Sequence, residues 1–155
     1  MNWDAIGAIG EIIGAGAVVF SLVYLSIQIQ RQAAESRAAA AHEIAHAFRE
    51  SVAVFSNSEM ADLFLKGHSD VDSLSEKEKL QLITSVQRVL RVWEEAFVMH
   101  RKGRLEADLW EPMISQYCSL LATPVIQYVW KARKSYYNNE FRSFVDSLDP
   151  TDYII

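Results

Sequence analysis

The chain of 155 residues has one cysteine and fewer basic than acidic residues, and each shortage excludes a class of protein. The lone Cys118 cannot form an intramolecular disulfide, so no disulfide framework holds the fold and nothing points to an oxidising compartment. A formal net charge of -5 argues against a dedicated nucleic-acid binder, for which a basic domain is expected. The sequence has no P-loop, dinucleotide glycine fingerprint or Cys/His cluster, so we predict a non-enzymatic protein without a cofactor.

Charge is missing altogether from Ile12 to Gln30. Extended back to Ile6, this run gives roughly 36 Å of helix at about 1.5 Å per residue. That length crosses a bilayer core of about 30 Å with some tilt. A cleaved signal peptide needs a basic segment before its apolar core, whereas Asp4 precedes this run and no Lys or Arg does. We therefore predict a transmembrane helix in residues 1–30, with a buried core helix as the alternative.

The flanking charges predict the orientation of this span. Arg31 and Arg37 follow the run, and only Asp4 and Glu11 lie on its N-terminal side. The positive-inside rule places the N-terminus outside and the remaining residues, 31–155, in the cytoplasm.

Small residues recur along the span at three- and four-residue spacing, at Gly7, Gly10, Gly14, Ala17 and Ser21. Gly10 and Gly14 form a G-x-x-x-G, which lets two helix backbones approach closely in lipid. Glu11 lies on the same face, although an ionised carboxylate inside the bilayer costs on the order of 3 kcal/mol. A hydrogen bond to a partner helix removes most of that cost. Because the chain has only one membrane-spanning helix, the simplest partner is the same helix of a second copy. We therefore predict a homo-oligomer that assembles through this face.

Two roles for Glu11 stay open. A ring of carboxylates can line a cation- or proton-permeable pore, since intramembrane acids often mark such pathways. Alternatively, Glu11 forms a structural hydrogen bond between helices near the outer interface, which is the role we favour. The competing class of function is a membrane-anchored helical interaction or scaffold module without transport.

The rest of the chain predicts an all-α fold. Strong helix formers without Gly or Pro continue the first helix, as one rod from about Asp4 to Phe55, into a cytoplasmic helical bundle. Beyond the span, this rod carries an apolar face at Ile44, Phe48, Val52 and Phe55. No segment has the period of two that is typical of strands. Further helices are expected at 59–67, 75–102, 106–122, 124–136 and 139–148.

Local signals mark the ends of these helices. Gly67 and Gly103 are predicted to end the second and third helices. Ser75 with Glu78 forms a capping box, and Thr123 followed by a proline is an N-cap. Residues expected in the core of the bundle are Cys118, Trp93, Phe97, Trp110 and Trp130.

Several blocks of the sequence resemble a group of small bacterial membrane proteins of unknown function. These blocks are the opening "MNWDAIGAIGEIIGAGAVVFSLVYLSIQIQRQ", then "NSEMADLFLKG" and "VWEEAFVMHRKGRLEADLW", and a W..R..Y...F ending. The most specific block contains Gly7, Gly10 and Glu11. The resemblance implies a bacterial inner-membrane protein with one span and a helical cytoplasmic part. It implies no activity, cofactor or catalytic residue.

His42 to His46 spell H-E-I-A-H, the motif in which two helical histidines bind zinc and Glu43 activates a water. A membrane zinc peptidase is therefore a second alternative function. It lacks a convincing third ligand, because Glu59 is not in the expected helical glutamate motif, and no strand is predicted to hold a substrate. We favour solvated or core-edge histidines.

The same residues also suggest two other hypotheses for a metal site. Glu43 and His46 form the E-x-x-H half of a di-iron site, to which Glu94 and Glu95 can add carboxylates, but no second E-x-x-H exists. A ring of His42 and His46 across an oligomer can bind metal or sense pH near neutrality.

"YVWKARKSYY", at residues 128–137, mixes basic and aromatic residues as a single-strand nucleic-acid surface does. On a helix, however, Lys131 and Lys134 lie opposite the apolar residues, which is ordinary amphipathicity. Contact with anionic membrane lipid is the better prediction for these lysines in an anchored protein.

Overall fold

The computed structural model describes the backbone of residues 3–153 and the side chains of Trp3 and residues 7–153. Helix accounts for 84% of the chain and the described part holds no strand, which confirms the predicted all-α class. The chain forms two compact units, Met1–Ala38 and Ala39–Ile155. The predicted domains, 1–30 and 31–155, also include residues 1–2 and 154–155, which lie outside the described residues. Their boundary, set where the uncharged run ends, stays a prediction.

The first helix, α1 (Trp3–Ala53), contributes to both units and agrees with the predicted rod. A short 3-10 turn, η1 (Val54–Ser56), closes it, and Asn57 then leaves helical geometry with φ -77° and ψ 132°. This helix is long and apolar enough to cross a membrane by length and composition, and its most apolar window is not buried anywhere. The predicted long, apolar N-terminal helix is therefore present.

In the second unit, α1 presents the expected apolar face. Ala40 and Ile44 are buried in the core, and Phe48 and Val52 are half-buried on the same side of the helix. Ser51, buried between them, donates its hydroxyl hydrogen to the carbonyl of Phe48 at 2.8 Å. Because this hydroxyl is satisfied within the helix, it does not interrupt the apolar contact.

The second helix, α2 (Ser58–Ser69), corrects the prediction made for Gly67. Asn57 caps its start by accepting a hydrogen bond from the backbone N–H of Glu59 at 2.9 Å. The helix passes through Gly67 and ends two residues later, so Gly67 is not a C-terminal glycine. A Cβ at this position would lie 3.0 Å from both Leu82 Cδ1 and Val125 Cγ2. Gly67 therefore lets α2 approach α3 and α5 closely.

The longest helix of the bundle, α3 (Glu76–Arg101), begins at the predicted capping box. The Ser75 hydroxyl accepts from the N–H of Glu78, whose carboxylate accepts from the N–H of Ser75 at 2.7 Å. Lys66 on α2 reaches the same carboxylate at 2.8 Å. Hydrogen bonds from Lys66 and then Ser75 lower the pKa of Glu78 to about 2. After the helix, Gly103 adopts φ 66°, the left-handed conformation that favours glycine.

Three further helices complete the bundle: α4 (Ala107–Leu121), α5 (Pro124–Arg133, extended by the 3-10 turn η2, Lys134–Tyr136) and α6 (Asn139–Asp146). They match the predicted helices to within two residues. The Thr123 hydroxyl accepts from the N–H of Ile126, which confirms the predicted N-cap of α5.

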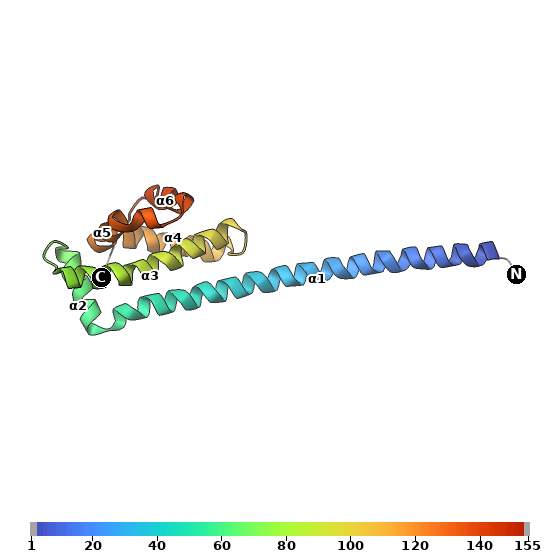
Figure 1. Ribbon diagram of the computed structural model, residues 1–155, viewed down its shortest axis with the longest axis horizontal. Helices are drawn as coiled ribbons and strands as arrows, with labels where there is room; N and C mark the ends of the chain where they lie inside the picture. The colour runs from blue at the N-terminus through green and yellow to red at the C-terminus, as the bar shows by residue number, and fades with distance from the viewer. Residues whose placement is uncertain (1–2, 154–155) are drawn as a thin grey trace. The chain divides into compact units, whose positions relative to one another are not determined.

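The helix at the centre of this unit is α3, which contacts α2, α4, α5 and α6 (Figure 1). Phe141 on α6 is fully buried and meets the rings of Trp93, Phe97 and Trp130. The aromatic residues predicted for the core are all buried, as is the free thiol of Cys118.

Candidate functional site

The apolar side chains of α1 between residues 9 and 29 are left uncovered by the described part of the chain. Ile12 is 73% exposed and Phe20 is 76% exposed, and the other large apolar side chains between residues 9 and 29 are exposed as well. Burying a side chain of this size is worth about 1.5–3 kcal/mol. A contiguous apolar surface on this scale is the mark of a membrane or protein interface.

The small residues of α1 share one face, as the sequence predicts. At about 100° per residue, Gly7, Gly10, Gly14, Ala17, Ser21 and Glu11 fall within an arc of about 120°. Nothing lies within 4 Å of the position that a Cβ would take at Gly7, Gly10 or Gly14. The glycines therefore leave a shallow, open strip of backbone, of the kind that close helix–helix contact in lipid uses.

Polar groups continue this face toward the following arginines. The Ser21 hydroxyl donates to the carbonyl of Ala17 at 2.8 Å, so the helix itself satisfies it. One and two turns further on, the Gln28 amide donates to the phenol oxygen of Tyr24 at 2.9 Å. Sequence reasoning missed this pair, although its spacing from Ser21 is visible in the sequence. The remaining amide capacity of Gln28 is available to a neighbouring helix.

Glu11 lies at one edge of the small-residue face. Its side chain is exposed, and among the side chains that the structure describes it has no hydrogen-bond or ion-pair partner. Ile12 and Ile13 follow it directly and are both exposed. A carboxylate among such neighbours is satisfied by water or by a group on another molecule.

The H-E-I-A-H motif lies on the part of α1 that belongs to the second unit. Ile44 is buried, whereas His42, Glu43 and His46 are exposed. His46 Nδ1 lies 3.8 Å from a carboxylate oxygen of Glu50. Across the described chain, no three His, Cys, Asp or Glu side chains gather as a group able to hold a metal ion. His42 and His46 as metal ligands thus stay a prediction.

The carboxylates considered as further ligands lie elsewhere. Glu59 is exposed in the first turn of α2, and Glu95 is exposed on α3. Glu94 has a structural role that the sequence did not reveal, because it accepts hydrogen bonds from Arg91 at 2.6 Å and from the backbone N–H of Asn138 at 2.7 Å. The bond from Asn138 joins α3 to the segment that leads into α6.

The basic and aromatic segment 128–137 is divided between core and surface. Trp130 is buried and donates its indole N–H to Asp146 at 2.8 Å, and Lys134 binds the other carboxylate oxygen at 3.1 Å. Tyr137 is buried beneath the guanidinium of Arg91. Lys131 is exposed, as its predicted position on the helix requires. Most of the aromatic surface in this segment is therefore used for packing.

No protein-family model matches this chain, and neither the curated proteins nor the solved structures that we searched contain a match.

Proposed function

We propose that this chain is a single-span membrane protein that associates with copies of itself through the small-residue face of α1. The observation that carries this proposal is the exposed apolar surface of the first unit, interrupted by an open glycine strip. Lipid covers the large apolar side chains, and the strip meets the same strip of a second copy. The positive-inside rule places the second unit, which follows Arg31 and Arg37, in the cytoplasm, consistent with a bacterial inner-membrane protein.

Glu11 is the polar contact of this interface. In lipid its carboxylate is costly unless it is protonated or hydrogen-bonded, and the neighbouring copy supplies both an acceptor and a donor at the same depth. Its place in the first turns of the helix also puts the group near the outer interface, where water is close. A hydrogen bond between helices is therefore the role that we assign to Glu11, and a cation or proton path is the alternative.

Glu11→Gln in proteoliposomes separates these roles. We expect the native chain to float with liposomes and to resist alkaline extraction, as a spanning protein does. Gln keeps the hydrogen-bonding capacity but not the charge, so we expect the oligomer to persist and cation and proton flux to stay at the level of empty liposomes in both proteins.

The matched control is Glu35→Gln, which removes a charge beyond the predicted span. Flux through the native protein that Glu11→Gln abolishes and Glu35→Gln keeps would replace our assignment with the pore. A native chain that alkaline treatment extracts would contradict the membrane span itself.

A further inference from the structure

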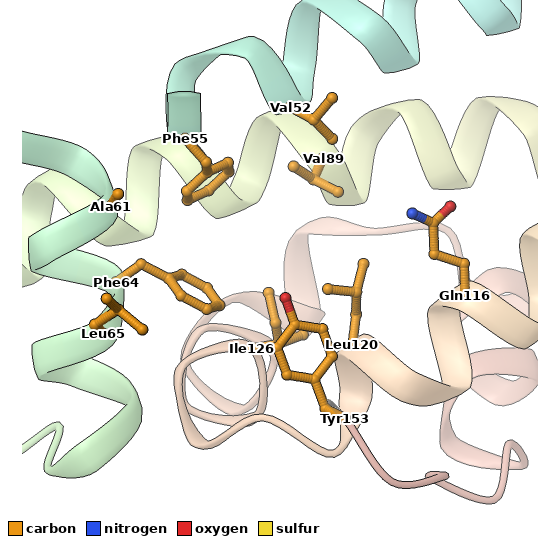
Figure 2. Close-up of a pocket in the computed structure, with 10 residues that line it drawn as sticks. All are labelled: Val52, Phe55, Ala61, Phe64, Leu65, Val89, Gln116, Leu120, Ile126 and Tyr153. Carbon is orange, nitrogen blue, oxygen red and sulfur yellow. The ribbon is translucent and has the colours of Figure 1, made fainter. Parts of the chain in front are cut away.

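The second unit contains a cavity of about 400 Å³ that is partly open to solvent and is lined by the end of α1, by α2 to α5 and by the C-terminal tail (Figure 2). Its volume falls within the range of about 300–1,000 Å³ that is usual for small-molecule sites. Most of its lining is hydrocarbon or aromatic, from residues that include Val52, Phe55, Phe64, Leu120 and Ile126.

The tail forms a defined wall of this cavity. The backbone N–H of Thr151 donates to the carbonyl of Cys118 at 3.1 Å, and the Ser119 hydroxyl donates to the carbonyl of Asp152 at 3.2 Å. These bonds hold Tyr153 at the cavity, with its ring centroid 6.2 Å from that of His68. The cavity is therefore built by fixed contacts of the chain.

The polarity of the cavity is uneven. Gln116 and Tyr153 are the only polar side chains among its described lining residues, and none of these is charged. In Figure 2, the Gln116 amide lies at the opposite end of the space from Phe64 and Leu65. This amide is exposed and has no hydrogen-bond partner within residues 3–153. One end thus offers a hydrogen-bond donor and acceptor, and the other offers hydrocarbon.

Size and charge restrict the occupant. At about 30 Å³ for a group of the size of water or a methylene, the cavity holds roughly a dozen such groups. This is the bulk of one medium-length hydrocarbon tail, not of the two tails of a phospholipid. A partner helix, about 10–12 Å across with its side chains, needs far more room. A carboxylate or phosphate head would find no cationic partner among the lining residues, whereas an uncharged hydroxyl or amide can both donate to and accept from the Gln116 amide.

We propose that this cavity binds one single-tailed, medium-chain lipid with an uncharged hydroxyl or amide head, as in a fatty alcohol. The head hydrogen-bonds Gln116, and the tail lies against Phe55, Phe64 and Leu120. The proposal uses only the second unit and does not depend on the association of α1.

The test uses the full chain held in solution by an amphipathic polymer, with a decanol analogue that carries a diazirine at the end of its tail. After illumination, we expect label in the tryptic peptide Glu50–Lys66, which contains Phe55 and Phe64. Unlabelled decanol should compete, and decanoate should not. From hexanol to decanol, competition should strengthen by about four-fold per methylene, the transfer value for one buried CH₂. Competition by decanoate as strong as that by decanol, or the same competition at every chain length, would overturn the proposal.

Ala61→Phe and Leu120→Phe each add bulk within the cavity, and we expect each to reduce labelling by about ten-fold. Ala132→Phe is the matched control, because Ala132 is exposed on α5 and does not line the cavity. Circular-dichroism melting identifies the variants that fold. Full labelling of a folded cavity variant would contradict the site.

A chain shortened after Tyr153 tests a competing occupant of the cavity, the chain's own Ile154 and Ile155. We expect this truncation to leave labelling unchanged. A rise of about ten-fold, equivalent to burial of one or two methylenes, would identify the C-terminus as the occupant and overturn the lipid proposal.

Discussion

The two units of this protein use apolar residues in opposite ways. In the second unit, Trp93 and Phe141 are covered on all sides by their own chain, whereas in the first unit Ile12 and Phe20 leave most of their surface exposed. Composition alone does not separate these cases, since both regions are rich in large hydrophobic residues. The difference lies in whether the same chain supplies the covering surface. One unit is stabilised by its own core, whereas the described chain leaves the apolar surface of the other exposed.

The glycines of the two units differ in the same way, because one is packed against side chains of the chain and the others are not. Gly67 is surrounded, with Leu82 and Val125 side chains at the limit of contact, while Gly10, Gly14 and Gly16 have open space. The first kind of glycine serves packing that is already complete within the chain. The second kind leaves open space beside the helix backbone, which on our proposal a second copy of the chain fills.

The largest difference between the units should appear when one aromatic ring is removed from each. We expect Phe141→Ala to lower the free energy of unfolding of the second unit by about 3–5 kcal/mol, because the ring is fully buried. Phe20→Ala should change it by less than about 0.5 kcal/mol, since the ring is exposed and the described residues leave it uncovered. Chemical unfolding in detergent, followed by circular dichroism, measures both. Equal losses would mean that Phe20 contributes to the same core.

A smaller difference in the free energy of unfolding is expected between substitutions at two glycines. Gly67→Val forces bulk against Leu82 and Val125, and we expect it to destabilise the second unit by about 1–3 kcal/mol. Gly16→Val meets nothing within 4 Å and should leave the unfolding of that unit unchanged. The same unfolding measurement applies. An unchanged midpoint for Gly67→Val would show that α2 moves away from its neighbours at little cost.

The smallest expected effect is a pH dependence in the second unit. Glu78 has its pKa lowered from 4.5 to about 2, chiefly by Lys66 and then by Ser75. A carboxyl group whose pKa is lower in the folded than in the unfolded state stabilises the fold at pH values above its unfolded pKa. The contribution of Glu78 is therefore complete above about pH 4.5 and is lost as the pH falls toward about 2. The melting temperature of Glu78→Gln should therefore lie below that of the native chain at pH 6, and the gap should shrink on acidification. Glu95→Gln, exposed on the same helix, serves as the control, and a gap for Glu78→Gln that is constant with pH would contradict this origin.

Much of the fold could be predicted because its signals are local. The capping box of Ser75 and Glu78 and the cap at Thr123 use side chains within three residues of the backbone groups that they satisfy, so sequence spacing reveals them. The prediction that Gly67 ends the second helix was wrong, because in the sequence a glycine that caps a helix cannot be distinguished from one that makes room for a distant side chain. The Glu94 bond to Asn138, across a sequence separation of 44 residues, has no local signal.

The candidate site likewise has one part that could be predicted from local spacing and another that could not. Helical periodicity fixes which residues share a face, so the strip from Gly7 to Ser21 could be predicted from spacing. The cavity beside Tyr153 could not, because its walls come from five helices, a 3-10 turn and the tail. The surface that covers the strip belongs, on our proposal, to a second copy of the chain, and only the association of two chains reveals it.

The most direct measurement is the mass of the detergent-solubilised protein, for the native chain and two double variants. Gly10→Leu with Gly14→Leu fills the strip, and Ala8→Leu with Gly16→Leu adds the same side chains outside its arc. We predict an oligomer for the native chain, monomers for the first variant and the native mass for the second, because only the first blocks close backbone approach. A native chain that is monomeric, or an oligomer that Gly10→Leu with Gly14→Leu leaves intact, would contradict self-association through this face.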